Sequence, residues 1–131
     1  MGPVYAGDVV IPLLASYREG LEKALRYDTE GRTFDDVVEQ VSSGHAQFWP
    51  ITYHSVIVTQ VSGKTLHYWL AAGRIAELEA VTPLILDFGR DTGCTRATLT
   101  GRQGWIRSFL SGTGWREVGR ADGIIQMEVD L

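Results

Sequence analysis

At residue 45 the spacing of apolar side chains changes from a helical period to an alternating one, and this change constrains the fold more than any other feature of the chain. Three strands are predicted directly after it, at residues 46–52, 54–61 and 64–71. Ser62 and Gly63 form a pair typical of two-residue hairpin turns, and Pro50 favours a sheet edge or a bulge. The middle of the chain therefore predicts a β-sheet that contains a hairpin.

Helices are predicted on both sides of these strands, at residues 8–25, 33–41 and 74–90. A polar turn at residues 28–32 separates the first two helices. Thr33 and Asp36 resemble a capping box at the start of the second. In the third helix Pro83 must produce a kink or a restart, because proline donates no backbone hydrogen bond.

Residues 92–115 are predicted to form a strand, a glycine-containing turn and an amphipathic helix. Residues 94–100 are rich in β-branched and apolar side chains, as in a buried strand, and Gly101 ends that strand. Four apolar side chains follow at helical spacing, namely Trp105, Ile106, Phe109 and Leu110. A final hairpin is predicted at residues 115–129, with its turn at Asp122 and Gly123. With a strand stub at residues 4–6, the predicted order is (β)-α-α-β-β-β-α-β-α-β-β, a mixed α+β (α/β) domain spanning residues 1–131.

The composition is that of an ordinary globular protein and excludes several classes of function. The chain has 131 residues, 44% of them hydrophobic and 21% charged, enough for one domain with a real core. Its net charge of −4 argues against a protein that binds nucleic acid phosphates. No apolar run is long enough to span a membrane, and the N-terminus lacks the pattern of a signal peptide. The single cysteine, Cys94, has no internal disulfide partner, and the three histidines have no metal-ligand spacing.

The predicted order resembles the GNAT N-acetyltransferase fold, which has a mixed central sheet with helices on both faces. More closely, residues 44–118 are similar to small GNAT-like proteins of tailed bacteriophages. The positions that carry this resemblance are Gly93, Cys94, Thr95, Gly101, Arg102, Gly104, Trp105, Arg107, Gly114 and Trp115.

The resemblance implies where acetyl-CoA would be held. Acetyltransferases of this fold bind its pyrophosphate on a glycine-containing loop between the fourth strand and the next helix. The matching loop here, residues 70–76, has Gly73 at the first glycine position but Ile75 in place of the second small residue. A β-branched side chain there is expected to obstruct the phosphates, so Gly73 forms a plain turn in the simpler interpretation. Arg74 either meets an anion at the helix start or is a solvated surface residue.

The proton-transfer groups implied by the resemblance, a carboxylate on a central strand and a tyrosine on the later helix, are not found. The three central strands contain no Asp or Glu, and no tyrosine follows Tyr68. His67 and Tyr68 are the substitutes, although neighbours on a strand point to opposite faces. The simpler interpretation makes His67 a hydrogen-bonded structural residue.

Four residues are candidates for interaction with a partner, namely Trp49, Arg102, Trp105 and Arg107. Aromatic rings at a sheet edge provide apolar surface for docking, and arginines beside a tryptophan can contact an anion. In the competing interpretation both tryptophans fill the core and Arg102 pairs with a nearby acid.

Two functions from different classes follow. The first, favoured by the incomplete loop, is a non-enzymatic bacteriophage virion component, internal or tail-associated, which uses the fold as a protein-interaction module. It implies no cofactor, other virion proteins as partners with several copies per particle, and a location in the virion after synthesis in the host cytoplasm. The alternative is an N-acetyltransferase with an atypical loop and acetyl-CoA as its cofactor. A third, weaker hypothesis is a small regulator of a host protein.

Overall fold

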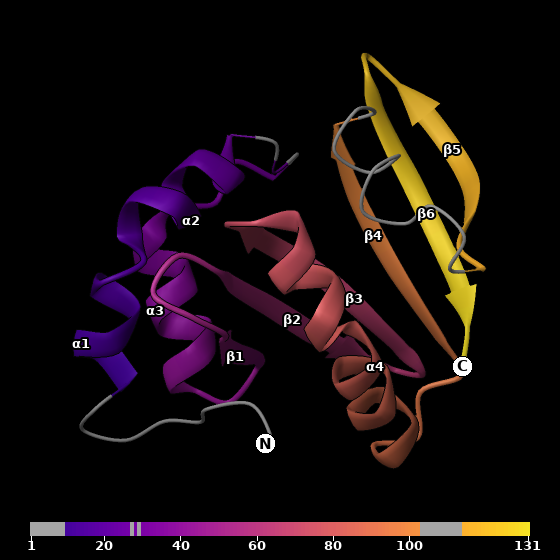
Figure 1. Cartoon of the computed structure of the whole chain (residues 1–131), viewed down its shortest axis with the longest axis horizontal. Coiled ribbons are helices and arrows are strands. Elements are labelled where there is room, and N and C mark those ends of the chain that lie inside the picture. Colours follow the sequence, from indigo (N-terminus) through magenta and orange to yellow (C-terminus); the bar gives the residue numbers. More distant parts are fainter. Residues whose placement is uncertain (1–9, 27, 29, 103–113) are drawn as a thin grey trace.

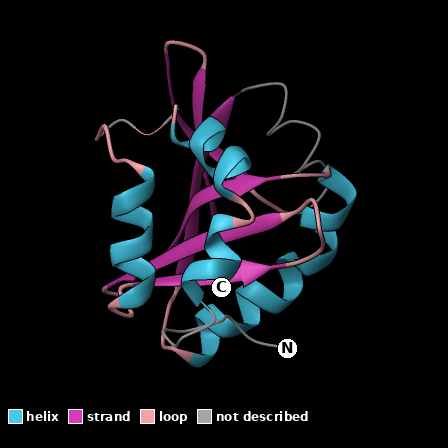
Figure 2. Cartoon of the chain, turned by 90° about the vertical axis from the view of Figure 1, so that its left-hand side faces the viewer, coloured by secondary structure: helices cyan, strands magenta, loops and turns pink. Residues whose placement is uncertain are grey.

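The computed structural model describes residues 10–26, 28, 30–102 and 114–131, and it has a six-stranded sheet with helices on both faces (Figures 1 and 2). The helices are α1 (Val10–Ala15), α2 (Arg18–Leu25), α3 (Phe34–Ser42) and α4 (Ile75–Asp91). The strands are β1 (Ala46–Pro50), β2 (Val56–Ser62), β3 (Thr65–Ala72), β4 (Arg96–Arg102), β5 (Arg116–Ala121) and β6 (Ile124–Asp130). The predicted mixed α+β class is therefore confirmed. The predicted stub at residues 4–6 and the predicted helix carrying Trp105 lie outside the described residues.

The strands follow the order β1-β2-β3-β4-β6-β5 across the sheet. The β3–β4 pair is parallel and the other pairs are antiparallel. Pro50 ends β1 at the edge of the sheet, as predicted, where its missing N–H is not needed by a second neighbour. The turn between β5 and β6 is also confirmed, since Asp122 and Gly123 both have positive φ.

The predicted strands differ from the observed ones by one or two residues at most ends, since β1 stops at Pro50, β2 begins at Val56 and β4 begins at Arg96. Two of the differences have a clear structural reason. The β2–β3 turn consists of Gly63 and Lys64 instead of Ser62 and Gly63, because Ser62 still pairs with Thr65 in the ladder. β4 does not end at Gly101. It continues to Arg102 because β6 supplies a hydrogen-bonding partner for that whole length.

Among the helices, one prediction is confirmed, one is corrected, and one of two alternatives is excluded for a third. Thr33 and Asp36 form the expected capping box at the start of α3. The single helix predicted over residues 8–25 is instead divided into α1 and α2 at Tyr17, whose hydroxyl donates to Thr52 O at 2.6 Å and whose ring packs edge-on against Phe48. α4 passes through Pro83 without a restart.

The sheet separates two cores. The α1–α3 core lies between the sheet and helices α1, α2 and α3, and contains Leu14, Leu21, Leu25, Phe34, Val37, Val41, Ala46, Phe48, Val56, Val58, Trp69 and Leu70. The α4 core lies on the other face, and contains Trp49, Ile57, Leu66, Tyr68, Leu78, Ile85, Cys94, Ala97, Leu99, Trp115 and Ile125. No helix among the described residues is long and apolar enough to cross a membrane.

Candidate functional site

The sheet opens between its two central parallel strands. β3 and β4 pair over only four positions, the last of which is Tyr68 with Leu99. Past that point β3 pairs with β2 and β4 pairs with β6, so the edges of β3 and β4 that face each other have no partner strand in the described part of the chain. The paired register therefore leaves backbone N–H and C=O groups of both strands available to a ligand.

A β-bulge lies where the strands separate. Val58 pairs with Leu70 and Thr59 pairs with Tyr68, so Trp69 is an extra residue on β3. Because of this insertion Trp69 and Leu70, although adjacent, both belong to the α1–α3 core. A bulge bends its strand and increases the local twist, which accounts for the divergence of β3 from β4.

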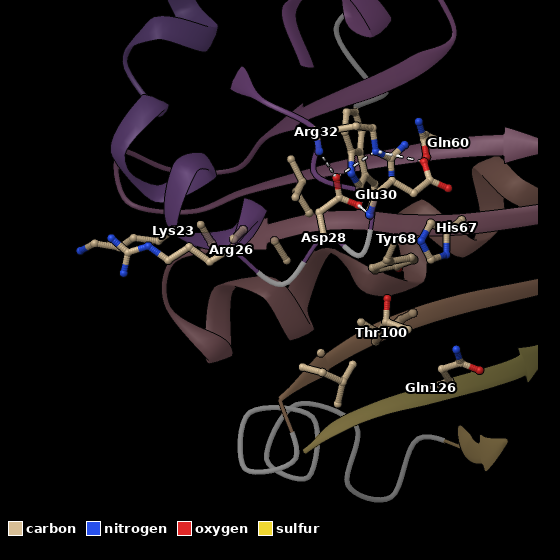
Figure 3. Close-up of a pocket in the computed structure, with 18 of the residues that line it drawn as sticks. Lys23, Arg26, Asp28, Glu30, Arg32, Gln60, His67, Tyr68, Thr100 and Gln126 are labelled. Carbon is tan, nitrogen blue, oxygen red and sulfur yellow. Dashed lines mark hydrogen bonds and ion pairs between the residues drawn. The ribbon is translucent and has the colours of Figure 1, made fainter. Parts of the chain in front are cut away.

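A cleft of about 1200 Å³ occupies this opening. It extends from α2 and the α2–α3 connection, across β3 and β4, to the β5–β6 turn. Figure 3 shows Arg32, Asp28, Glu30 and His67 on the β3 side, with Thr100 and Gln126 on the other side. The cleft therefore joins segments that are far apart in the sequence.

An ion pair stacked on a tryptophan forms one wall of the cleft. Arg32 donates from Nε and Nη2 to the two carboxylate oxygens of Asp28, both at 3.0 Å, and its backbone N–H donates to the same carboxylate. The guanidinium lies 4.3 Å from the centroid of the Trp69 ring. Burial works to raise the pKa of Asp28, but the bonds from Arg32 outweigh it and hold this pKa below the usual value. The cluster is thus a preorganised charged wall, with the Glu30 carboxylate 3.5 Å from Arg32 on its outer side.

His67 lines the same cleft one residue before the strands separate. Its Nδ1 lies 2.8 Å from the Thr98 hydroxyl on β4, which orients the ring. Burial lowers the pKa of His67, and the nearby Arg32 lowers it further. The imidazole is therefore neutral at pH 7.

Tyr68 occupies the opposite face of β3, as its position next to His67 predicts. Its ring is 1% exposed in the α4 core and packs edge-on against Trp115. The hydroxyl has no hydrogen-bond partner among the described residues, and burial raises its pKa. Tyr68 also borders the cleft, but its hydroxyl is buried.

Gly73 connects β3 to α4 through a close backbone contact. Its φ is +122°, and a Cβ at this position would lie 2.4 Å from both His54 O and Ser55 Oγ. The buried Ser55 hydroxyl accepts from the Arg74 N–H at 3.0 Å and donates to Glu77 at 2.6 Å. Gly73 is thus required by the packing of the β3–α4 turn on residues 54 and 55.

The start of α4 fits an anion better than the sequence suggests. Ile75 was expected to obstruct the phosphates, but its side chain packs against the α4 core. The first intrahelical bonds are donated by Glu77 and Leu78, so the N–H groups of Ile75 and Ala76 precede them at the positive end of the helix. The exposed Arg74 lies at the N-cap of the same helix.

The four interaction candidates are placed differently. Trp49 is 2% exposed and donates from Nε1 to the buried Thr59 hydroxyl, so its ring fills the core and does not present a docking surface. Arg102 is the last residue of β4. Trp105 and Arg107 lie outside the described residues. In the part of the chain that the structure describes, no cluster of three His, Cys, Asp or Glu side chains is arranged to hold a metal ion.

Sequence reasoning missed the Asp28–Arg32–Trp69 cluster. The sequence places Asp28 and Arg32 in a polar turn, and nothing local shows that this turn lies over a strand tryptophan. Their spacing of four residues allows an ion pair, and this was the one available indication.

Comparison with known proteins identifies the fold. No family model matches the chain, and a search of curated proteins found no match. Among solved structures, the aminoglycoside 6'-N-acetyltransferase from Enterococcus faecium matches with a TM-score of 0.69 at 10% identity, covering 99% of this chain and 97% of that one. A Bacillus subtilis acetyltransferase in complex with CoA matches with a TM-score of 0.62 at 12% identity, covering 100% and 97%. A PaiA N-acetyltransferase from Thermoplasma acidophilum in complex with coenzyme A has a TM-score of 0.62 at 12% identity, covering 92% and 94%.

The chain therefore has a GNAT-like fold. The predicted non-enzymatic virion component is contradicted, because the three solved structures named above, which match almost the whole chain, are acetyltransferases, two of them in complex with CoA. The matches favour the alternative that the sequence left open. Nothing in them bears out the bacteriophage kinship or the absence of an acetyl-CoA loop.

Proposed function

We propose that this chain is an N-acetyltransferase that takes acetyl-CoA into the cleft between β3 and β4 and an amine from the α2 side. The observation that carries the proposal is the opening of the sheet after Tyr68 and Leu99, with unpaired strand backbone on both sides of a cleft. The pantetheine arm of CoA is an extended chain with two amide groups. Such a chain can add to an open strand edge by main-chain hydrogen bonding.

The start of α4 supplies the site for the pyrophosphate. Two backbone N–H groups, the helix dipole and the Arg74 guanidinium are all suited to an anion. Gly73 lines the cleft just before this helix start, so a single extended molecule can contact both regions. In the proposed complex the thioester end lies between the two strands.

The acceptor side is polar and carries both signs of charge. Arg32 and Asp28 form a fixed wall, and the exposed Glu30 carboxylate lies beside them. An acceptor that bears an amino group meets an acidic side chain here without displacing the Arg32–Asp28 pair. Aminoglycosides belong among the amines to be tested, because the structural neighbours include aminoglycoside 6'-acetyltransferases.

Two measurements on the purified chain test the proposal. Isothermal titration with CoA is expected to give a micromolar Kd. Incubation with acetyl-CoA and a panel of primary amines is expected to release free CoA thiol in proportion to acetylated amine. Failure to bind CoA at millimolar concentration contradicts the proposal.

A further inference from the structure

His67 is the one histidine that lines the cleft, and its surroundings favour a neutral imidazole that can accept a proton. It lies on β3 immediately before Tyr68, where pairing with β4 ends, so its ring stands beside the opening. The other two histidines, His45 and His54, are exposed and do not line the cleft. A thioester bound between β3 and β4 would have its carbonyl group near His67, on the side of the cleft where Arg32 lies.

Nδ1 of the His67 ring is engaged with Thr98, and no hydrogen bond to Nε2 is found among the residues that the structure describes. Nδ1 lies 2.8 Å from Thr98 Oγ1, on the strand that pairs with β3 at this position. This contact anchors the ring across the β3–β4 ladder. When Nδ1 carries the proton and donates it to Thr98, Nε2 carries the lone pair of this ring that lines the cleft.

The electrostatic surroundings of His67 come from three directions. The α2–α3 connection contributes Arg32, Asp28 and Glu30, of which the arginine lowers the pKa of His67 and the two acids raise it. Lys23 of α2 and Arg26 at its C-cap also line the cleft, as do Arg120 of β5 and Asp122 of the β5–β6 turn. Burial is the largest influence, and the net result is a neutral ring at neutral pH.

We propose that His67, held by Thr98, is the general base that removes the proton from the attacking amine. The proposal rests on the acetyltransferase function above. As the amine nitrogen forms its bond to the thioester carbonyl carbon, the C–S bond breaks and the sulfur leaves with the electron pair. The proton lost by nitrogen passes to Nε2 of His67 and from there to the departing thiolate or to solvent.

A histidine base gives a distinctive dependence of rate on pH. Because the pKa of His67 is lowered, the acid limb of kcat/KM is expected below the ordinary histidine range, and the rate falls as His67 becomes protonated. His67→Gln is expected to lower kcat by about 100-fold, to remove this acid limb and to leave CoA affinity within about twofold of the wild type. His45→Gln is the matched control, because His45 makes a similar Nδ1 contact with Ser43 Oγ at 2.7 Å but lies outside the cleft. The His45→Gln variant is expected to leave kcat and the dependence of kcat/KM on pH unchanged.

Nitrogen-detected NMR of the free protein provides a test that needs no substrate. The expected result for the wild type is a neutral His67 with its proton on Nδ1. In the Thr98→Val variant, the fraction of His67 with the proton on Nδ1 is expected to change. A proton on Nε2 at neutral pH overturns the proposal even if the protein is an acetyltransferase. So does a His67→Gln variant that keeps more than a tenth of wild-type kcat with the acid limb intact. A wild type that fails to bind CoA removes the acetyltransferase function and this role of His67 with it.

Discussion

Tyr68 and Leu99 are the last two residues that pair between β3 and β4, and past them the facing edges of the two strands are unpaired and border an open cleft. Their side chains remain in the α4 core, at 1% and 3% exposure, so the core is continuous up to the point of separation. The opening is therefore bounded on one side by close packing. The opening between the strands results from the β-bulge at Trp69 and not from a gap in the core packing.

Filling the cleft should block binding without unfolding the protein. Thr100 lies on β4 past the separation and lines the cleft, half-buried. Thr100→Trp is expected to weaken CoA binding by at least about tenfold, or about 1.4 kcal/mol, because the indole occupies the space between the strands. Isothermal titration measures the change. Val118→Trp on the exposed face of β5 is the control, and a similar loss in that variant would contradict the placement of the site.

Gly73 should be the glycine least tolerant of a side chain among those described. Gly73→Ala places a Cβ 2.4 Å from His54 O and forces a φ of +122° on an alanine. We expect a loss of about 3 kcal/mol in the free energy of unfolding, measured by urea titration. Gly63→Ala also has a positive φ but meets open space, so about 1 kcal/mol is expected there. Equal losses in the two variants would show that the contact with residues 54 and 55 is unimportant.

The Asp28–Arg32 pair should make stability depend on pH in the acid range. The folded pKa of Asp28 is lowered, so its contribution is present above the unfolded value of 3.8 and is lost as pH falls through the folded value. Asp28→Asn is expected to cost about 2 kcal/mol at neutral pH, because Arg32 loses a charged, nearly buried partner. The difference from wild type should shrink in acid.

Urea titrations at about pH 7 and about pH 3 measure this difference. The control is Asp87→Asn, which removes an exposed pair with Arg90 and should cost less than about 0.5 kcal/mol at either pH. A penalty for Asp28→Asn that is the same at both pH values would exclude the ionic origin of the effect.

Local patterns in the sequence determined the elements of this protein. The alternation after residue 45, the capping box at Thr33 and Asp36 and the turn at Asp122 and Gly123 each depend on residues a few positions apart, and each is found in the structure. The order of these elements also indicated the GNAT-like fold. His67 was a candidate because it lies on a central strand, where the resemblance implies a proton-transfer group.

Tertiary structure decided what the elements do together. At the break between α1 and α2 the Tyr17 hydroxyl bonds to Thr52, 35 residues away, and β4 pairs with β6 as far as Arg102. The cleft depends on one extra residue in β3, and its charged wall depends on Arg32 reaching Trp69. These contacts join segments far apart in the chain. Periodicity and turn chemistry describe each residue's immediate neighbours, so they predict strands and helices but not where two paired strands separate.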